Sequence, residues 1–298
     1  MNKLDLHADD YGISPNNSTK ILELTQKGFL NSFSIIPNMS KYNECMDILK
    51  AQWASLPTKP LISVHINLVG GIALSPAFTP YKSWGEIFKA SFIPGKKHRK
   101  MKNILKEEIK CQIKRVYDDI QSIGITSLRL DSHIHVHMIP IVFDAMLEAV
   151  SELQLMDSLE FVRIPKEPIL MFFTTKGVRG TFPLINVIKN LVLRILSIKA
   201  ISKLNRLNIS HGMLCGLILS GQMNSSRINI LYSKLNKYLL KRNVTMELLA
   251  HPGRVLEEEA TPEFGPDDKI AFVSPNRDEE YKMFTLFPNT LLPPEHFL

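Results

Sequence analysis

The sequence contains few cysteines and begins without the apolar run of a secretory signal. Its three cysteines, Cys45, Cys111 and Cys215, are an odd number and widely spaced, which excludes a dense disulfide framework and a paired-cysteine metal site. The first residues, MNKLDLHADDYG, carry carboxylates at once and lack an apolar core of signal-peptide length. We therefore expect a cytoplasmic protein with reduced thiols.

Internal repeats and low-complexity tracts are also missing, which argues against a solenoid or a disordered chain. The 298 residues are 45% hydrophobic and 8% aromatic, enough for a sizeable core. The formal net charge of +7 is modest for this length. It favours anionic partners or membrane surfaces without specifying either, and we expect no nucleic-acid partner.

Strand-like and helix-like segments alternate along the chain at the spacing of βα units, which predicts an α/β protein with a parallel sheet of about seven strands. The expected strands are 3–9, 31–37, 61–68, 130–138, 159–164, 213–219 and 244–250. The expected helices are 21–30, 39–53, 105–123 and 140–153, followed by the longer segment 184–201.

The segment 69–101 breaks this alternation and is rich in glycine and proline. Loops of this length in compact domains are usually lids or binding loops. Trp84 and Phe88 are the side chains that we expect to hold it against the protein.

A second irregular segment, residues 166–206, holds eight Lys or Arg residues and one acid. Its helical part is broad in Leu, Ile and Val, but Lys189, Arg194 and Lys199 interrupt it, so it is not a clean membrane span. The sequence leaves three interpretations open: a buried scaffold helix, a homodimer contact, or a helix that lies on a membrane surface.

The stretch 130–140, LDSHIHVHMIP, places Asp131, His133, His135 and His137 at every second position. A strand has a side-chain period of two, so a strand here would direct all four to one face. A solvated, histidine-rich face is the plain alternative. Four titratable or metal-competent groups in line favour a metal or acid–base site instead.

Further carboxylate and imidazole groups follow other predicted strands: Asp9 and Asp10 the first, His65 within the third, His251 the last. Singly, each has an ordinary explanation, such as a helix cap, a turn or a satisfied core histidine. Because the carboxyl ends of parallel strands converge at one face, we expect these groups to form one site.

Carboxylate oxygen and imidazole nitrogen suit Zn²⁺, Co²⁺ or Mn²⁺, and suit Mg²⁺ less naturally. Three protein ligands would leave positions open for water and substrate. A spare carboxylate and a spare histidine then suit a general base and a general acid. The pattern predicts metal-assisted hydrolysis, although spacing alone does not single out which histidine of 133, 135 and 137 is a ligand.

The motifs HADDYGIS, SVHINL, LDSHIHVHMIP and ELLAHPG, in this order, resemble those of the YdjC-like (ChbG-type) carbohydrate deacetylases. With RIP at 163–165 and FVSPNRDEE near the C-terminus, the resemblance runs from residue 3 to about 283. It implies a single domain over 1–298, an irregular seven-stranded (β/α) barrel. It also implies removal of an N-acetyl group from an amino sugar or oligosaccharide.

The resemblance further implies roles for residues of this chain. It assigns one divalent ion, Zn²⁺ or Mg²⁺, to Asp10, His65 and His133. It makes Asp9 the general base and His251 the general acid. Residues expected to orient the ligands or the sugar are Asp131, His135, His137 and Arg163.

Two rival functions remain open at this stage. A metal-dependent phosphoesterase on a similar barrel fits the positive charge, but it would need a second, Asp-richer metal site, and the sequence shows only one set of ligands. A non-catalytic protein that only binds glycans or a membrane surface would not need both Asp9 and His251. The basic segment 166–206 adds the expectation of a peripheral membrane contact, at the inner face of the membrane, and of a lipid-linked sugar.

Overall fold

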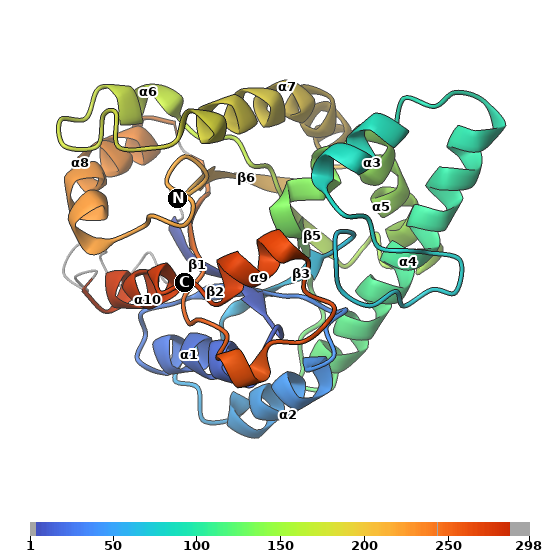
Figure 1. The fold of residues 1–298 in the computed structure, drawn as a ribbon, viewed down its shortest axis with the longest axis horizontal. Helices are drawn as coiled ribbons and strands as arrows, with labels where there is room; N and C mark the ends of the chain where they lie inside the picture. Colours follow the sequence, from blue (N-terminus) through green and yellow to red (C-terminus); the bar gives the residue numbers. More distant parts are fainter. Residues whose placement is uncertain (1–3, 243, 287–298) are drawn as a thin grey trace.

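A computed structural model describes residues 4–242 and 244–286, and its centre is a closed barrel of seven parallel strands (Figure 1). The strands are β1 (Leu4–Tyr11), β2 (Ser32–Ile35), β3 (Leu61–Ile66), β4 (Leu128–Ser132), β5 (Leu159–Arg163), β6 (Ser210–Cys215) and β7 (Met246–Ala250). Each strand pairs in parallel with the next, and β7 pairs with β1. The predicted seven-stranded α/β barrel is confirmed.

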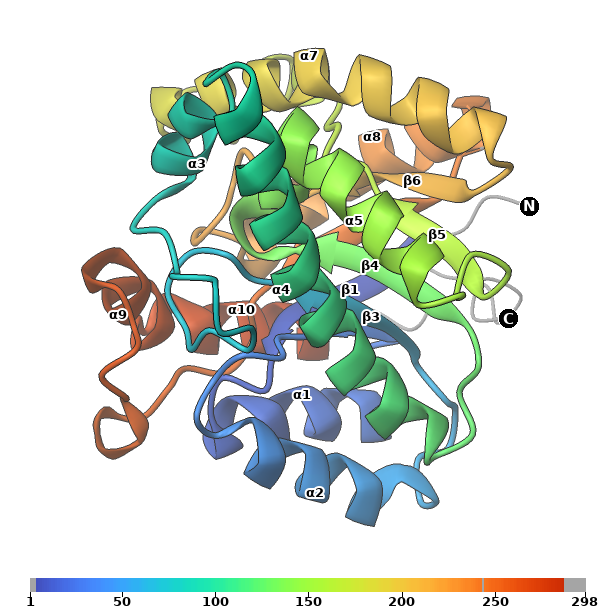
Figure 2. The ribbon, with the colours of Figure 1, turned by 90° about the vertical axis from the view of Figure 1, so that its right-hand side faces the viewer.

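Helices surround the barrel on its outer side (Figures 1 and 2). They are α1 (Pro15–Gln26), α2 (Tyr42–Trp53), α3 (Trp84–Ala90), α4 (Lys96–Gln121), α5 (Pro140–Glu152), α6 (Ile169–Phe173), α7 (Leu184–Arg206), α8 (Ser225–Arg242), α9 (Pro266–Phe272) and α10 (Asn276–Leu286). Two short 3₁₀ segments cover His133–Met138 and Glu257–Glu259.

Local sequence signals explain where the first helix begins. The Ser14 side chain accepts a hydrogen bond from the backbone N–H of Asn17, and Pro15 occupies the first turn. Both features favour a helix start. The Ser14 hydroxyl gives a partner to one free backbone N–H of the first turn, and proline has no backbone N–H that would need one. The buried face of α1 includes Ile21 and Leu22, which join the main core.

Polar and charged side chains fill the barrel interior. Along β1, Leu4, Leu6 and Ala8 alternate with Asp5, His7 and Asp9, and both sets are buried. The two aspartates of the polar set reach strands that do not neighbour β1: Asp5 pairs with Arg129 of β4 at 3.2 Å, and Asp9 pairs with Arg163 of β5 at 3.0 Å. Because such contacts cross the barrel, this charged set lies inside it.

The histidine-rich stretch is not one continuous strand, which corrects the sequence prediction. β4 ends at Ser132, and His133–Met138 form a 3₁₀ segment. Ile134 and His135 adopt left-handed backbone angles, with φ of 43° and 59°. The neighbouring strands offer no backbone hydrogen-bond partners beyond this point. Ser132 pairs with Ile66, the last residue of β3, and the pairing of β4 with β5 ends at Leu130. The period of two therefore did not place all four polar residues on one face.

Three other segments differ from the prediction in extent. α4 begins at Lys96, nine residues before the predicted start at 105. The apolar pattern did not reveal its first turns, because they are polar and carry no apolar stripe. The irregular excursion between β3 and α4 is correspondingly shorter. Within it Trp84 and Phe88 stack on each other at 4.8 Å, and both pack against the main core, as expected. β6 begins at Ser210 and ends at Cys215, where Gly216 follows with φ of 145°.

The C-terminal part carries helices that composition alone did not indicate. Residues 257–268 carry no periodic apolar pattern, yet α9 begins at Pro266 and lies over the open end of the barrel (Figure 1). Asp267 and Asp268 occupy its first turn, where carboxylates stabilise the helix dipole. This helix brings acidic side chains to the strand ends.

Candidate metal and catalytic site

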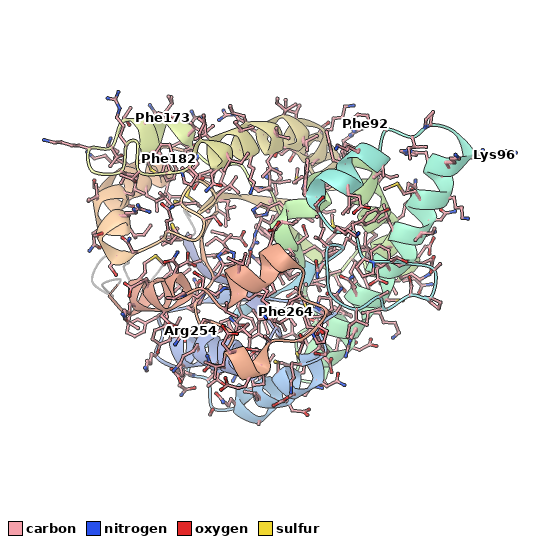
Figure 3. All side chains as sticks on the ribbon, in the orientation of Figure 1. Phe92, Lys96, Phe173, Phe182, Arg254 and Phe264 are labelled. Carbon is pink, nitrogen blue, oxygen red and sulfur yellow. The ribbon has the colours of Figure 1, made fainter. Side chains whose placement is uncertain are left out.

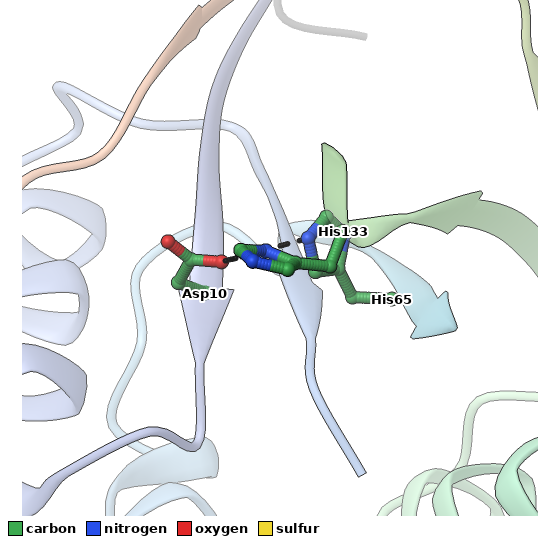
Figure 4. Close-up of side chains that lie close together, drawn as sticks. All are labelled: Asp10, His65 and His133. Atoms are coloured by element: carbon green, nitrogen blue, oxygen red, sulfur yellow. Dashed lines mark ion pairs between the residues drawn. The ribbon is translucent and has the colours of Figure 1, made fainter. Parts of the chain in front are cut away.

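Three predicted ligands meet at the carboxyl ends of the strands. Asp10 of β1, His65 of β3 and His133, which directly follows β4, offer ligand atoms that all lie within 4.8 Å of one another (Figure 4). Asp10 Oδ1 lies 3.5 Å from His65 Nε2 and 3.4 Å from His133 Nδ1. All three side chains are buried. The structure thus brings together two imidazole nitrogens and one carboxylate oxygen.

The Asp10 carboxylate is prepared for a cation. Its Oδ1 is buried and makes no hydrogen bond of good geometry; it faces the two ring nitrogens at 3.4 and 3.5 Å. Its backbone has φ of 71°, an uncommon conformation for a residue other than glycine. Such strain is typical of functional sites, where the surroundings hold it in place. A divalent ion between these three residues would satisfy Oδ1.

Each imidazole is oriented by a second carboxylate. Asp131 Oδ1 accepts from His65 Nδ1 at 2.6 Å, which directs His65 Nε2 towards Asp10. On the other side, His133 Nε2 lies 3.3 Å from Asp268 Oδ1, which leaves Nδ1 facing Asp10. Metal-binding histidines commonly donate their second N–H to a carboxylate, and this contact fixes the tautomer and the ring orientation.

The carboxylates also shift the histidine pKa values. Burial lowers the pKa of His65, but the charges of Asp9 and Asp131 outweigh burial and raise it to about 10. For His133, burial again lowers the pKa, and the contacts with Asp10 and Asp268 raise it to about 9. In the metal-free protein these rings therefore hold protons at neutral pH. A metal ion would take the place of those protons.

The C-terminal helices complete the wall around this triad. Phe272 of α9 packs against the His133 ring, with centroids 5.8 Å apart. Arg277 of α10 donates to Asp10 Oδ2 at 2.6 Å. Burial raises the pKa of Asp10, but Arg277 and the two histidines hold it well below its usual value. Arg277 therefore occupies one oxygen of Asp10 and leaves the other, Oδ1, for a cation.

Asp9 lies beside the triad in a separate set of contacts. Ser34 Oγ donates to Asp9 Oδ1 at 2.8 Å, and His7 Nε2 lies 3.2 Å from the same oxygen. Burial raises the pKa of Asp9, but the Arg163 guanidinium and nearby histidines hold it well below its usual value. Asp9 is therefore ionised at neutral pH and can accept a proton. Its Oδ2 lies 3.9 Å from His65 Nε2, so it borders the triad.

Arg163 links three buried carboxylates across the barrel. Its Nη1 lies 3.0 Å from Asp9, its Nη2 2.8 Å from Asp131 and its Nε 2.5 Å from Glu247. All four side chains are almost completely inaccessible to solvent. A buried charge is costly unless an opposite charge lies close to it, and the Arg163 guanidinium lies close to all three carboxylates. It contacts the general-base candidate and the carboxylate that orients His65.

A second group of potential ligands lies beneath the first: His7, Asp9 and Asp131. The sequence had shown only one set, so this finding corrects that prediction. The missed signal was the alternation in β1, which places His7 two residues before Asp9 on the inner face. However, the Arg163 guanidinium already pairs with both carboxylates of this group, so their negative charge is balanced by an arginine.

His251 follows β7, at the level of Asp9. The register pairs Ala8 with Ala250, so the next residue of each strand lies at the same height of the barrel. The His251 side chain is 24% exposed, more open than the triad. Glu280 of α10 accepts from the His251 backbone N–H at 2.5 Å and lies 3.4 Å from its Nδ1. Glu280 thus contacts the Nδ1 side of the ring.

The two remaining histidines of the motif differ from each other. His137 contacts Ser132 Oγ and donates through Nε2 to the Arg163 carbonyl at 2.8 Å, so it braces the ends of β4 and β5. Burial lowers its pKa to about 4, and it is neutral. His135 is buried with Nδ1 unpartnered, and burial holds its pKa well below the usual value. Neither joins the Asp10 triad.

Sequence inspection missed several residues of the site. Asp268 comes from the acidic segment that has no recognisable pattern, whereas Phe272 and Arg277 lie inside the FVSPNRDEE motif, for which the sequence indicated no roles. Glu247 and His7 were visible only as polar residues at alternate positions of strands that otherwise read as apolar. Their function depends on contacts across the barrel, which local sequence does not reveal.

Several curated proteins are similar to part of this chain. A carbohydrate deacetylase of Clostridium beijerinckii is 25% identical over 151 residues, covering 50% of this chain and 57% of that protein. A carbohydrate deacetylase of Danio rerio is 25% identical, covering 57% and 52%. A chitooligosaccharide deacetylase of Yersinia pestis is 26% identical, covering 47% and 52%. The chain thus spans about half the length of the curated relatives that it matches.

A solved structure from Enterococcus faecalis, named for cellobiose-phosphate cleavage, has the same fold along nearly the whole chain. The TM-score is 0.56 at 13% sequence identity, and the superposition covers 95% of each chain. At this identity the likeness concerns the fold alone. The model of the YdjC-like protein family matches residues 3–286, and the chain therefore belongs to the YdjC-like protein family.

Proposed function

We propose that this protein is a metal-dependent hydrolase that removes the N-acetyl group from an N-acetylated amino sugar or oligosaccharide. The proposal rests on one observation above all. Asp10, His65 and His133 converge on a single point, and an ionised second carboxylate, Asp9, borders them. The names of the relatives, carbohydrate deacetylase and chitooligosaccharide deacetylase, support the same reaction.

The donor set fits one divalent ion, held by Asp10 Oδ1, His65 Nε2 and His133 Nδ1. Two nitrogens and one oxygen suit Zn²⁺ well, and Mg²⁺ remains the other expected ion. When bound, such an ion acts as a Lewis acid for the acetyl carbonyl and for water. The protein's own residues would then handle the protons.

Asp9 would act as the general base. It is ionised, since Arg163 holds its pKa low, and Ser34 and Arg163 fix its orientation. A carboxylate in this position accepts the proton of the attacking water. His251 would act as the general acid and donate a proton to the departing amine. It lies on the adjacent strand end and is partly exposed, so a bulky sugar can reach it.

Asp131, Arg163, His135 and His137 would support these groups. Asp131 directs His65, and Arg163 neutralises Asp131 and Asp9 together. His137 holds the carbonyl of Arg163, and His135 lies buried in the turn beside it. Such supporting partners typically change metal affinity or activity 10- to 100-fold when altered.

A phosphoesterase is the second candidate, and one observation favours it: the additional group His7, Asp9 and Asp131 could be a second metal site. The Arg163 guanidinium, 2.8–3.0 Å from both carboxylates of that group, supplies the compensating charge instead. We therefore favour a single ion and amide hydrolysis. A lipid-linked form of the sugar is a narrower version of this proposal, and it depends on the membrane contact described below.

Metal analysis combined with an acetate-release assay tests the proposal. The substrates are N-acetylglucosamine, chitooligosaccharides and, for the rival function, a phosphodiester. We expect one divalent ion per chain and acetate release from an N-acetylated sugar. His65→Ala and His133→Ala should lose both while remaining folded. His211→Ala is the matched control, since the His211 ring is hydrogen-bonded to Asn205 and belongs to neither candidate metal-binding group found among the described residues. Full metal occupancy in both site variants would contradict the ligand assignment.

A further inference from the structure

Helix α7 is apolar on two opposite faces. One face is buried against the protein and includes Val187, Leu193 and Leu204. The other, here named the α7 outer face, consists of the exposed side chains Leu184, Ile185, Ile188, Leu191, Ile195 and Ile198. These are 48% to 72% exposed, and they mostly recur at intervals of three or four residues, which places them on one side of the helix. Exposed apolar stripes of this length are uncommon on soluble surfaces.

The α7 outer face continues onto its neighbours. Leu170 and Phe173 of α6 are 78% and 42% exposed, and Phe92, which follows α3, is 70% exposed. Figures 1 and 3 show α6, α7 and α3 along one edge of the molecule, with Phe173 near one end of this edge and Phe92 near the other. The apolar surface therefore extends along the edge beyond α7 itself.

A cavity of about 270 Å³ opens at the Phe92 end of this surface. Its lining combines five apolar residues with three polar ones: Phe88, Phe92, Pro140, Ile141 and Leu196, and Ser91, His98 and Asp144. Leu196 belongs to α7 and Phe92 to the exposed edge, so the cavity adjoins the α7 outer face. The apolar part of this lining continues the exposed apolar surface and adds to the area that can contact a bilayer.

Positive charge accompanies these apolar side chains. α7 carries five cations and no acid: Lys189, Arg194, Lys199, Lys203 and Arg206. Of the ion pairs formed within the described residues, Lys203 to Asp144 is the one that involves α7. Lys189 and Arg194 lie on either side of the apolar stripe, and Lys199 and Arg206 lie towards its C-terminal end. Long cationic side chains in such positions reach the headgroup level of a bilayer while apolar neighbours enter it.

We propose that the α7 outer face, with α6 and Phe92, docks this protein on the surface of an anionic lipid membrane. The charge selects this occupant over a second copy of the chain. Two such faces in contact would oppose their cations without an acid of α7 to pair with, which disfavours association. The contact is peripheral, since no helix in the described ranges is long and apolar enough to cross a membrane.

The docking surface borders the open end of the barrel. α6 begins six residues after the carboxyl end of β5, and Phe92 lies in the excursion that follows β3. Both segments thus leave the barrel at the end that carries Asp10 and His133. Docking would bring that end close to the bilayer surface, within reach of an amino sugar on a membrane lipid. This last step rests on the proposed function, whereas the membrane contact does not.

Vesicle co-sedimentation of the full chain tests the contact directly, without reference to activity. One set of vesicles is phosphatidylcholine alone, and the other contains about one third phosphatidylglycerol. Binding should require the anionic lipid and weaken at about 0.5 M salt, where screening is strong. Each peripheral cation contributes about a fivefold factor in partitioning. The variant K189Q/R194Q/K199Q should therefore bind about 100-fold more weakly.

Two matched controls separate the docking face from general charge and hydrophobicity. K20Q/K41Q/K50Q removes the same charge from the region of α1 and α2, on the opposite side in Figure 1, and should bind like the wild type. Ile195→Ser should weaken binding about tenfold. Leu61→Ser, at an exposed apolar residue where β3 begins, at the opposite end of the strands, should not weaken it.

Three outcomes would overturn the proposal. The first is a wild-type protein that stays in the supernatant with anionic vesicles at low salt. The second is an equal loss of binding in the two triple variants. The third is a lipid-free dimer, seen by sedimentation velocity, that Ile195→Ser dissociates, because the face would then be a contact between copies. Membrane binding without acetate release would leave the contact standing and refute only the proposed reaction.

Discussion

Arg163 is the most informative side chain to remove, because its guanidinium contacts three buried carboxylates. In Arg163→Met the side-chain volume is largely kept, while Asp9, Asp131 and Glu247 lose their cation at 2.5–3.0 Å. Removing one partner of a buried ion pair typically costs about 3–5 kcal/mol, since the remaining charge stays buried. We expect the free energy of unfolding to fall by at least that amount at pH 7.

The loss should depend on pH with a definite sign. In the wild type, Arg163 holds the folded-state pKa of Asp9 and Asp131 below the usual value, so both contribute stability at neutral pH that disappears as the pH falls through those low values. Without Arg163, burial dominates and raises the pKa of these carboxyls in the folded state. The variant then gains stability relative to the wild type on acidification. The difference between the two proteins should be largest near pH 7 and shrink towards pH 4.

Urea unfolding of the metal-free protein, followed by circular dichroism at several pH values, measures this difference. Arg254→Met is the matched control. Arg254 pairs with Asp278 at 3.3 Å, but both side chains are 45% exposed, so its loss should cost less than about 1 kcal/mol. A destabilisation by Arg163→Met that is as small as the control, or that stays constant from pH 7 to pH 4, would refute this account of the barrel interior.

Three further results are expected. Asp9→Asn should retain the metal ion and lose about 10²–10⁴-fold in turnover, whereas Asp10→Asn should weaken metal binding itself. Metal analysis and kinetics measure the two effects, and the reverse pattern would mean that the roles of the two residues are exchanged. Metal binding should release protons and tighten as the pH rises from 6 to 8, because the pKa values of His65 and His133 are raised to about 10 and 9. Calorimetry in buffers of different ionisation enthalpy measures this proton release, and its absence would contradict the ligand set. Asp268→Ala, which frees His133 Nε2, should weaken metal binding about 10- to 100-fold, and unchanged affinity would show that Asp268 does not orient that ring.

The barrel and the convergence of the three candidate ligands could be predicted from the sequence because their signals are local. Each strand is short, apolar on one face and bounded by turn residues, and the helices between them repeat at βα spacing. Asp10, His65 and His133 each stand at the carboxyl end of a strand, and the parallel topology alone brings such ends together. The motif resemblance narrowed the choice among the histidines.

The supporting contacts were not accessible, because they join segments distant in sequence. Arg163 and Asp9 are 154 residues apart, and Arg277 and Asp10 are 267 apart. The acidic segment before α9 has no apolar period, yet Phe272 anchors that helix on the site by packing against His133 and Phe264. A helix of seven residues that is held by one or two aromatic contacts leaves no periodic trace in the sequence.

The adjacent carboxylates of β1 show how one irregularity separates two functions. In a regular strand, consecutive side chains point to opposite faces, so Asp9 inside the barrel would place Asp10 outside, among the helices. The pairing of β1 with β2 shifts register between Ala8 and Tyr11, and Asp10 adopts φ of 71° within that interval. A bulge of this kind redirects a side chain at the end of a strand. It lets Asp10 turn towards His65 and His133 while Asp9 remains with Arg163. Two carboxylates that are neighbours in the chain thereby acquire different partners, and the different roles proposed for them follow from that separation.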